Sequence, residues 1–140
     1  MKQPPVKRVL VVDDNELLLN TLVRSLALAG FEVVAHGTFE QARQALASER
    51  FDAVVTDVRL GDFNGLQLAV VSRTTNPDIR IIVFSGYDDP VLREEAESVG
   101  ATFLLKPVPG SEFVRLLSEQ RDSLPQTGAS EAVPRWARQA

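Results

Sequence analysis

Five polar residues directly follow short apolar runs of this sequence: Asp13, Asp14, Asp57, Ser85 and Lys106. Two carboxylates about 4 Å apart repel each other by about 4 kcal/mol where the effective dielectric constant is about 20. Three carboxylates in one cleft would therefore need a compensating cation. Oxygen ligands favour a hard divalent ion, and Mg²⁺ is commonly held by one or two carboxylates, water and a substrate phosphate. Lys106 would add a fixed positive charge to such a site.

Four of these residues also have an ordinary structural explanation. Asp13 and Asp14 would form an N-cap pair before Glu16, where acidic groups stabilise the positive end of a helix. Asp57 would be a loop acid, and Lys106 would be a solvated lysine. The residues nevertheless fall together at the ends of four apolar runs, which favours one shared site over separate explanations.

The elements that would position these residues alternate along the chain. Short runs rich in Val, Ile and Phe predict strands at residues 9–12, 31–34, 53–56, 79–84 and 102–105. Longer stretches of helical periodicity separate these runs, which is typical of a parallel sheet with helices on both faces. Because the runs are almost continuously apolar, the strands are predicted to be buried on both sides.

Capping and stop signals predict the helices between the strands. Their predicted ranges are residues 16–29, 38–48, 66–74, 89–100 and 111–123. The first helix ends before Gly30, and its apolar face is formed by Leu18, Leu22, Leu26 and Ala29. Thr38, Asp89 and Ser111 are the predicted N-caps of the second, fourth and fifth helices.

Five β-α units in about 120 residues predict a doubly wound α/β sheet of five parallel strands, in the order 2-1-3-4-5. Ligands of such sheets bind beyond the carboxyl ends of the strands, near the switch in strand order. The strands that precede Asp13 and Asp57 are neighbours at this switch. The three carboxylates are therefore predicted to converge, with Ser85 and Lys106 beside them.

The composition fits one soluble globular domain. The chain has 140 residues, of which 44% are hydrophobic and 24% are charged. The formal net charge of -4 offers no basic surface for phosphates, so this chain alone is not expected to bind nucleic acid. No apolar run approaches the roughly 20 residues of a membrane span, and no signal peptide is evident. With no Cys in the sequence, these features predict a cytoplasmic protein.

The helical and strand periodicity stops before the end of the chain. We predict an N-terminal extension at residues 1–6, one domain at residues 7–123, and a polar tail or linker stump at residues 124–140. Trp136 lies in the last segment, where an unfixed tail is favoured over one that docks on a surface. A stand-alone protein is favoured over a piece of a longer one.

Four segments of the sequence resemble the response regulator receiver family of two-component systems, and its chemotaxis regulators in particular. The segments are VLVVDDN, FDAVVTDVRL, IIVFSGY and FLLKP. The resemblance covers roughly residues 7–123 and is specific, because an acidic pair, a lone acid after an apolar strand, a hydroxyl residue and Lys-Pro occur in order. It implies a flavodoxin-like three-layer α/β/α fold. It also implies a phosphorylated signalling domain and not an enzyme that turns over a separate substrate.

The resemblance implies a role for each residue of the predicted site. Asp57 would accept a phosphoryl group from a sensor histidine kinase or a histidine phosphotransfer protein. Mg²⁺ or Mn²⁺ would be bound by Asp13, Asp14, Asp57 and the backbone carbonyl of Arg59. Lys106 would pair with the phosphoryl oxygens, and Ser85 would donate a hydrogen bond to them. The peptide between Lys106 and Pro107 is expected to be cis.

By the same resemblance, phosphorylation would shift the protein between two states. Ser85 would move toward the phosphoryl group and Phe103 would turn inward, although plain core packing is an alternative role for Phe103. The face made by the fourth helix, fifth strand and fifth helix would then bind a downstream protein, an output domain or a second copy. Arg59 and Tyr87 would modulate the phosphoryl lifetime. Residues 60–62 lie where the family often has Pro, which predicts a more mobile loop.

Other functions fit the same residues less well. A degenerate receiver would act as a constitutive interaction module and would not bind Mg²⁺. Flavin phosphate would face three carboxylates, which disfavours a flavin protein. A phosphatase of the haloacid dehalogenase type needs an Asp-x-Asp spacing, whereas this sequence has Asp13, Asp14 and Asn15 in succession. His36 is interpreted as a loop residue and not as a phosphohistidine relay or a metal ligand.

Overall fold

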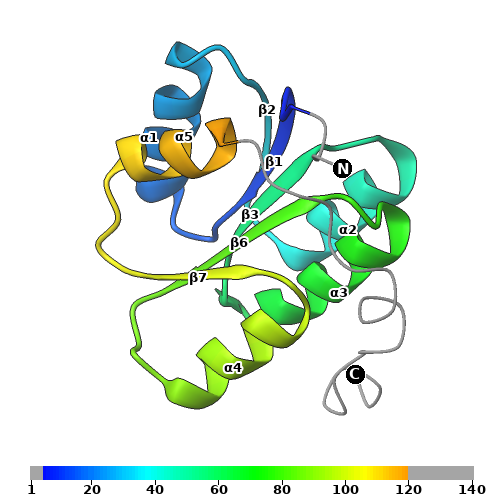
Figure 1. The fold of residues 1–140 in the computed structure, drawn as a ribbon, viewed down its shortest axis with the longest axis vertical. Helices are drawn as coiled ribbons and strands as arrows, with labels where there is room; N and C mark the ends of the chain where they lie inside the picture. Colours follow the sequence, from blue (N-terminus) through cyan, green and yellow to red (C-terminus); the bar gives the residue numbers. More distant parts are fainter. Residues whose placement is uncertain (1–4, 120–140) are drawn as a thin grey trace.

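Five parallel strands form one sheet in the order β2-β1-β3-β6-β7 (Figure 1). The computed structural model describes residues 5–119. The strands are β1 (Arg8–Val12), β2 (Glu32–His36), β3 (Ala53–Asp57), β6 (Arg80–Ser85) and β7 (Thr102–Leu105). When the strands of this sheet are counted in chain order, the order is 2-1-3-4-5. The predicted doubly wound, flavodoxin-like fold is therefore confirmed.

Helices cover both faces of the sheet (Figure 1). They are α1 (Glu16–Leu28), α2 (Phe39–Ser48), α3 (Gly65–Thr75), α4 (Pro90–Ser98) and α5 (Gly110–Ser118). Helices α1 and α5 pack on one face, and α2, α3 and α4 pack on the other. No helix among residues 5–119 is long and apolar enough to cross a membrane. The predicted tail at 124–140, with Trp136, lies outside the described residues.

The caps of the helices follow local side-chain chemistry. The Oγ1 of Thr38 accepts a hydrogen bond from the Gln41 N–H at 3.2 Å, and Asp89 accepts one from the Val91 N–H at 2.9 Å. Both predicted N-caps are therefore confirmed. The prediction for Ser111 is wrong: α5 begins at Gly110 after Pro109, so Ser111 lies inside the helix.

The end of α5 and the buried face of α1 also differ from the predictions. Helix α5 ends at Ser118, earlier than predicted, because the backbone of Glu119 is extended. Helix α1 buries Leu19, Leu22 and Leu26. Of the face predicted for α1, Leu18 is 44% exposed and Ala29 is also exposed. The helical periodicity predicted the helix correctly, and Leu22 and Leu26 are buried as predicted, but the packing against the sheet and α5 buries Leu19 in place of Leu18.

The core has two layers because side chains alternate across the strands. In β1, Leu10 and Val12 pack toward α2, α3 and α4, whereas Val9 and Val11 pack toward α1 and α5. Strands β1, β3 and β6 are almost fully buried, as predicted. Strands β2 and β7 lie at the two edges of the sheet and are only partly buried, so the prediction of burial on both sides fails for both.

A short antiparallel hairpin follows β3 and was not predicted. It pairs β4 (Arg59–Leu60) with β5 (Phe63–Asn64), and Gly61 takes a positive φ of 62° at its turn. The ring of Phe63 stacks on Phe39 of α2 at a centroid distance of 4.7 Å. The segment where the sequence predicted a mobile loop is thus a paired hairpin that contacts α2.

Candidate functional site

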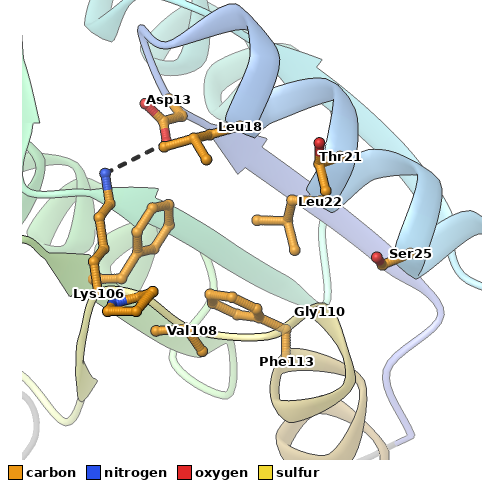
Figure 2. Close-up of a pocket in the computed structure, with 11 residues that line it drawn as sticks. Asp13, Leu18, Thr21, Leu22, Ser25, Lys106, Val108, Gly110 and Phe113 are labelled. Carbon is orange, nitrogen blue, oxygen red and sulfur yellow. Dashed lines mark ion pairs between the residues drawn. The ribbon is translucent and has the colours of Figure 1, made fainter.

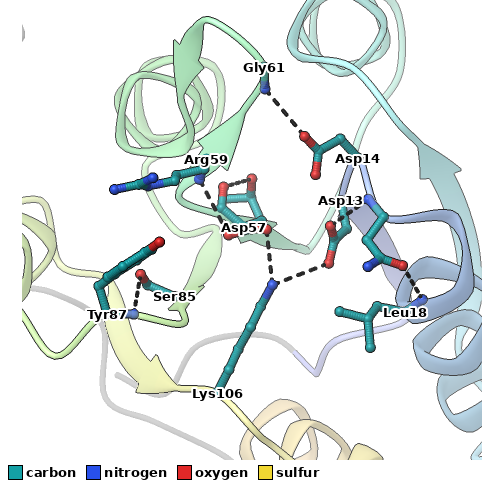
Figure 3. Close-up of polar contacts among 11 residues, drawn as sticks. Asp13, Asp14, Leu18, Asp57, Arg59, Gly61, Ser85, Tyr87 and Lys106 are labelled. Carbon is teal, nitrogen blue, oxygen red and sulfur yellow. Dashed lines mark hydrogen bonds and ion pairs between the residues drawn. The ribbon is translucent and has the colours of Figure 1, made fainter.

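Four strands of the sheet bring the five predicted polar residues together at the carboxyl ends of the strands (Figure 3). Asp13 and Asp14 follow β1, Asp57 ends β3, Ser85 ends β6, and Lys106 follows β7. In Figure 3, Lys106 points up between Asp57 and Asp13, and Asp14 lies beyond them near the hairpin. The parallel direction of the strands is the cause, since their carboxyl ends all lie on the same side of the sheet.

Three carboxylates cluster at these strand ends. Asp13, Asp14 and Asp57 each offer an oxygen, and these oxygens lie within 4.8 Å of one another. Asp13 is 1% exposed and Asp57 is 8% exposed, whereas Asp14 faces solvent. The cluster therefore has a buried floor and an open side.

The carboxylate of Asp13 is only partly satisfied by the protein. Its Oδ1 accepts a hydrogen bond from the Asn15 N–H at 2.9 Å. Its Oδ2 receives none from any residue within 5–119, and Lys106 Nζ lies 3.8 Å away. Burial raises the pKa of the Asp13 carboxyl, and the charges of Asp57 and Asp14 raise it further, against the opposing effects of the Asn15 N–H and Lys106.

A divalent cation fits this arrangement of oxygens. The buried Oδ2 of Asp13 has an ion pair with Lys106 but no hydrogen-bond donor among residues 5–119, and three carboxylates offer the oxygen ligands that Mg²⁺ prefers. Asn15, and not the acidic pair, caps α1, because its side chain accepts a hydrogen bond from the Leu18 N–H at 3.1 Å. The N-cap explanation for Asp13 and Asp14 is therefore wrong.

Asp57 is held from two sides. Lys106 Nζ donates a hydrogen bond to its Oδ2 at 3.0 Å, and the Arg59 N–H donates one to its Oδ1 at 3.3 Å. The Lys106 ammonium also lies 5.0 Å from the centre of the Phe84 ring, which adds a cation–π contact. The peptide between Lys106 and Pro107 is cis, as predicted.

Gly65 supports Asp57 from behind, a role that the sequence did not reveal. Its N–H donates to the Val58 carbonyl at 2.6 Å, so α3 starts directly against the end of β3. A Cβ atom at this position would lie 2.0 Å from the backbone oxygen of Asp57. Only glycine allows this approach.

Ser85 is oriented by the loop that follows it. Its Oγ accepts a hydrogen bond from the Tyr87 N–H at 3.1 Å, and its carbonyl accepts one from the Lys106 N–H at 2.8 Å. The guanidinium of Arg59 stacks on the Tyr87 ring at 4.2 Å. In Figure 3, these two side chains lie on the side of Asp57 opposite Asp13 and Asp14. The loops after β3 and β6 are thereby joined next to Asp57.

Phe103 lies away from the acidic cluster, in β7. It is 7% exposed and belongs to the core layer beneath α4. The guanidinium of Arg93 in α4 covers its ring at 4.8 Å, a contact that nothing in the sequence indicated. The prediction of a loop residue at His36 is wrong, because His36 is the last residue of β2 and pairs with Val12 of β1. Its backbone carbonyl accepts a hydrogen bond from the Asp13 N–H at 3.3 Å.

The raised pKa of Asp13 predicts that this carboxylate destabilises the metal-free fold. Because its pKa is higher in the folded than in the unfolded state, the destabilisation is full above the folded pKa and vanishes below the unfolded pKa, near about 4. We therefore expect Asp13→Asn to raise the free energy of unfolding near neutral pH. Urea unfolding in a chelator would measure this gain, which should shrink toward about pH 4.

The control for this experiment is Asp62→Asn, which removes an exposed carboxylate from the hairpin and should leave stability unchanged. With excess Mg²⁺ the parent protein should become more stable than the Asp13→Asn variant, because the parent protein binds the ion more tightly and gains more free energy of unfolding from it. A variant less stable than the parent in chelator would contradict the argument.

Comparison with known proteins agrees with this geometry. The family model described as response regulator receiver domain matches residues 9–118. The chain is 35% identical over 136 residues to the regulatory protein VirG of Agrobacterium fabrum, covering 91% of this chain and 52% of that protein. It is 35% identical over 121 residues to the photosynthetic apparatus regulatory protein RegA of Cereibacter sphaeroides, covering 85% of this chain and 65% of that protein. The chain thus spans between half and two thirds of the length of these relatives.

Solved structures show the same fold. A CheY-like response regulator receiver domain protein from Methanospirillum hungatei superposes with a TM-score of 0.76 at 25% identity, covering 80% of this chain and 90% of that one. A response regulator from Burkholderia pseudomallei superposes with a TM-score of 0.74 at 32% identity, covering 96% of this chain and 73% of that one. That structure is described as containing a phosphorylated aspartic acid, a calcium ion and citrate.

Proposed function

Because this chain belongs to the response regulator receiver family, we propose that Asp57 accepts a phosphoryl group from a phosphohistidine in a Mg²⁺-dependent reaction. The observation that carries the proposal is the position of the Asp57 carboxylate. It is hydrogen-bonded to Lys106 at 3.0 Å and lies within 4.8 Å of the oxygens of Asp13 and Asp14. The donor would be a sensor histidine kinase or a histidine phosphotransfer protein.

The residues of the site would divide the work of phosphoryl transfer. An Asp57 oxygen forms the new bond to phosphorus while the bond from phosphorus to the donor imidazole nitrogen breaks, and that nitrogen keeps the electron pair. A carboxylate nucleophile needs no further base, so catalysis rests on positioning and charge neutralisation. Lys106 already donates to the Asp57 oxygen and would pair with a phosphoryl oxygen after transfer.

The metal would be held by Asp13, Asp14, Asp57 and the Arg59 carbonyl. A bound Mg²⁺ supplies positive charge to the transferring phosphoryl group. The buried Oδ2 of Asp13 supports its role as a ligand, since this atom has no hydrogen-bond donor within residues 5–119. The open side at Asp14 supports access for the phosphoryl donor.

The signal would be a shift between two conformations. The phosphoryl group carries about 1.5 to 2 negative charges, which replace the single charge of the Asp57 carboxylate and favour a state with the Ser85 hydroxyl turned toward them. Phe103 would turn further inward, and the face formed by α4, β7 and α5 would change. A downstream protein, an output domain or a second copy of the chain would bind that face.

Residues beside Asp57 would set the lifetime of its phosphoryl group. Arg59 and Tyr87 stack at 4.2 Å beside Asp57, a position that supports their role in modulating the phosphoryl lifetime. The receiver domain would span residues 7–123, with a tail or linker stump at 124–140. The protein would act in the cytoplasm as a signalling domain without separate substrate turnover, and this chain alone would bind neither nucleic acid nor membrane.

Titration with beryllofluoride and Mg²⁺, a mimic of the aspartyl phosphate, tests the proposal. Backbone amide resonances of Asp57, Ser85 and Lys106 should shift, and the shifts should extend through Phe103 to α4. The same titration in chelator is the control and should leave the spectrum unchanged. If beryllofluoride and Mg²⁺ cause no change in the amide resonances even without chelator, the chain is instead a degenerate receiver that works as a constitutive interaction module.

A further inference from the structure

A mostly apolar pocket lies beside the acidic cluster, between α1 and α5 (Figure 2). Its volume is about 390 Å³, within the range of pockets that hold small ligands. Leu18 and Leu22 of α1 form one wall, and Val108 and Phe113 face them from the other side. An apolar pocket of this size commonly marks a binding site.

Polar groups stand along the edge of this pocket. Thr21 and Ser25 contribute hydroxyl groups on the α1 side, and Asp13 and Lys106 line the end next to the acidic cluster. The pocket therefore combines an apolar interior with hydrogen-bond acceptors at its margin. This combination suits an indole ring, which has a large apolar body and a single N–H donor.

The chain carries one such ring, Trp136, in the segment that follows α5. Although the sequence alone favoured an unfixed tail, the pocket provides a place for it, and we propose that residues 124–140 dock there with the indole of Trp136 between α1 and α5. Val133 and Ala137 place further apolar side chains near the indole along the sequence. Arg135 and Arg138 flank it, and their positive charges complement exposed Asp14 and Glu16 at the start of α1.

The length of the chain permits this contact. Trp136 lies 17 residues after Glu119, the last described residue, and a random-coil linker of that length would have a root-mean-square span of roughly 20–25 Å. Helix α5 has 9 residues and is therefore about 14 Å long, and its first turn forms part of the pocket. The path back from the end of α5 is thus shorter than the linker's span. Tethering raises the effective concentration of the segment at the pocket to the millimolar range.

Docking would place the segment next to Asp57. Asp13 and Lys106 line the pocket and also contact each other at the acidic cluster, so a bound indole would lie beside that cluster. The docking itself does not depend on phosphorylation of Asp57. Its test can therefore fail or succeed independently of the proposed function.

Fluorescence of the 140-residue chain tests the docking, because Trp136 is its only tryptophan. Excitation at the red edge avoids Tyr87. We expect Trp136 to emit at shorter wavelength, and to be quenched several-fold less by acrylamide, than in a synthetic peptide of residues 124–140. Leu18→Lys and Val108→Lys, each tested separately, should move both readouts toward those of the peptide.

Leu28→Lys is the matched control, because Leu28 is on the same helix, is 80% exposed and does not line the pocket. It should leave the emission and quenching unchanged. Equal emission and quenching in the full chain and the peptide would overturn the proposal. So would protection that survives both pocket variants in folded protein, or protection that appears only at high protein concentration, since a second copy would then supply the indole.

Discussion

Asp57→Asn is expected to reduce acid-labile labelling by acetyl phosphate and Mg²⁺ to background. The amide has no carboxylate oxygen to form the acyl phosphate bond, and the neighbouring carboxylates are poor substitutes. Asp13 is 1% exposed, so a phosphoryl donor has little access to it. Asp14 is exposed, but the Lys106 ammonium contacts Asp13 and Asp57 and has no ion pair with Asp14 among residues 5–119.

The matched control for this experiment is Asp62→Asn. Asp62 is an exposed carboxylate in the hairpin, five residues after Asp57, and its loss should leave labelling at the parent level. Both variants should be compared at equal protein and Mg²⁺ concentrations, with folding checked by circular dichroism. Persistent labelling of Asp57→Asn would show that another residue accepts the phosphoryl group and would remove the basis of the proposed function.

The sheet was predictable from sequence because its strands are mostly buried on both faces. A short, continuously apolar run such as that of β6 is stable mainly as a strand covered on both faces. The helices between such runs connect the strands in a parallel direction. Strand β2 shows the limit of this argument, since an edge strand can be apolar yet only half-buried. The hairpin after Asp57 was missed because its strands have only two residues each.

Helix positions were less predictable than helix existence. In α1, the sequence offers Leu at positions 17, 18 and 19, so several faces satisfy the helical period. The tertiary contacts with α5 and the sheet decide that Leu19 is buried and that Leu18 lines the pocket. In α5, Ser111 has the chemistry of a cap, but the chain already turns into the helix after Pro109.

The convergence of the five polar residues could be predicted, whereas the contacts that hold them could not. The convergence follows from topology, because each residue ends or follows a strand of one parallel sheet. The stacking of Arg93 on Phe103 and the approach of Gly65 to Asp57 depend on how α3 and α4 pack. No local pattern of residue types encodes those distances.

The approach of Gly65 to Asp57 leads to the second large expected effect. Gly65→Ala should lower the free energy of unfolding by about 3 kcal/mol, the upper part of the range for overpacked sites. Its Cβ atom would lie 2.0 Å from the Asp57 backbone oxygen and 3.0 Å from Thr56 Oγ1. The nearest atom belongs to the backbone, so no side-chain rotation can relieve the overlap. The start of α3 and the end of β3 would have to separate.

That separation should also change the site, because Asp57 carries the clashing carbonyl. We expect Gly65→Ala to weaken Mg²⁺ binding and slow labelling by acetyl phosphate, even where most of the protein stays folded. Gly86→Ala is the matched control, because Gly86 is next to Ser85 and lacks a positive φ, and a Cβ atom added there would meet nothing within 4 Å. The stability of this control should change by less than about 0.5 kcal/mol.

Urea unfolding and Mg²⁺ titration of both glycine variants would measure these effects. A loss of stability and of Mg²⁺ affinity in Gly65→Ala alone would show that the close start of α3 holds Asp57 in place. If Gly65→Ala matched Gly86→Ala in both measurements, there would be more room between α3 and Asp57 than the 2.0 Å distance from the added Cβ atom to the Asp57 backbone oxygen implies. The geometry of the acidic cluster would then depend on the strand ends alone, and not on the packing of α3 behind Asp57.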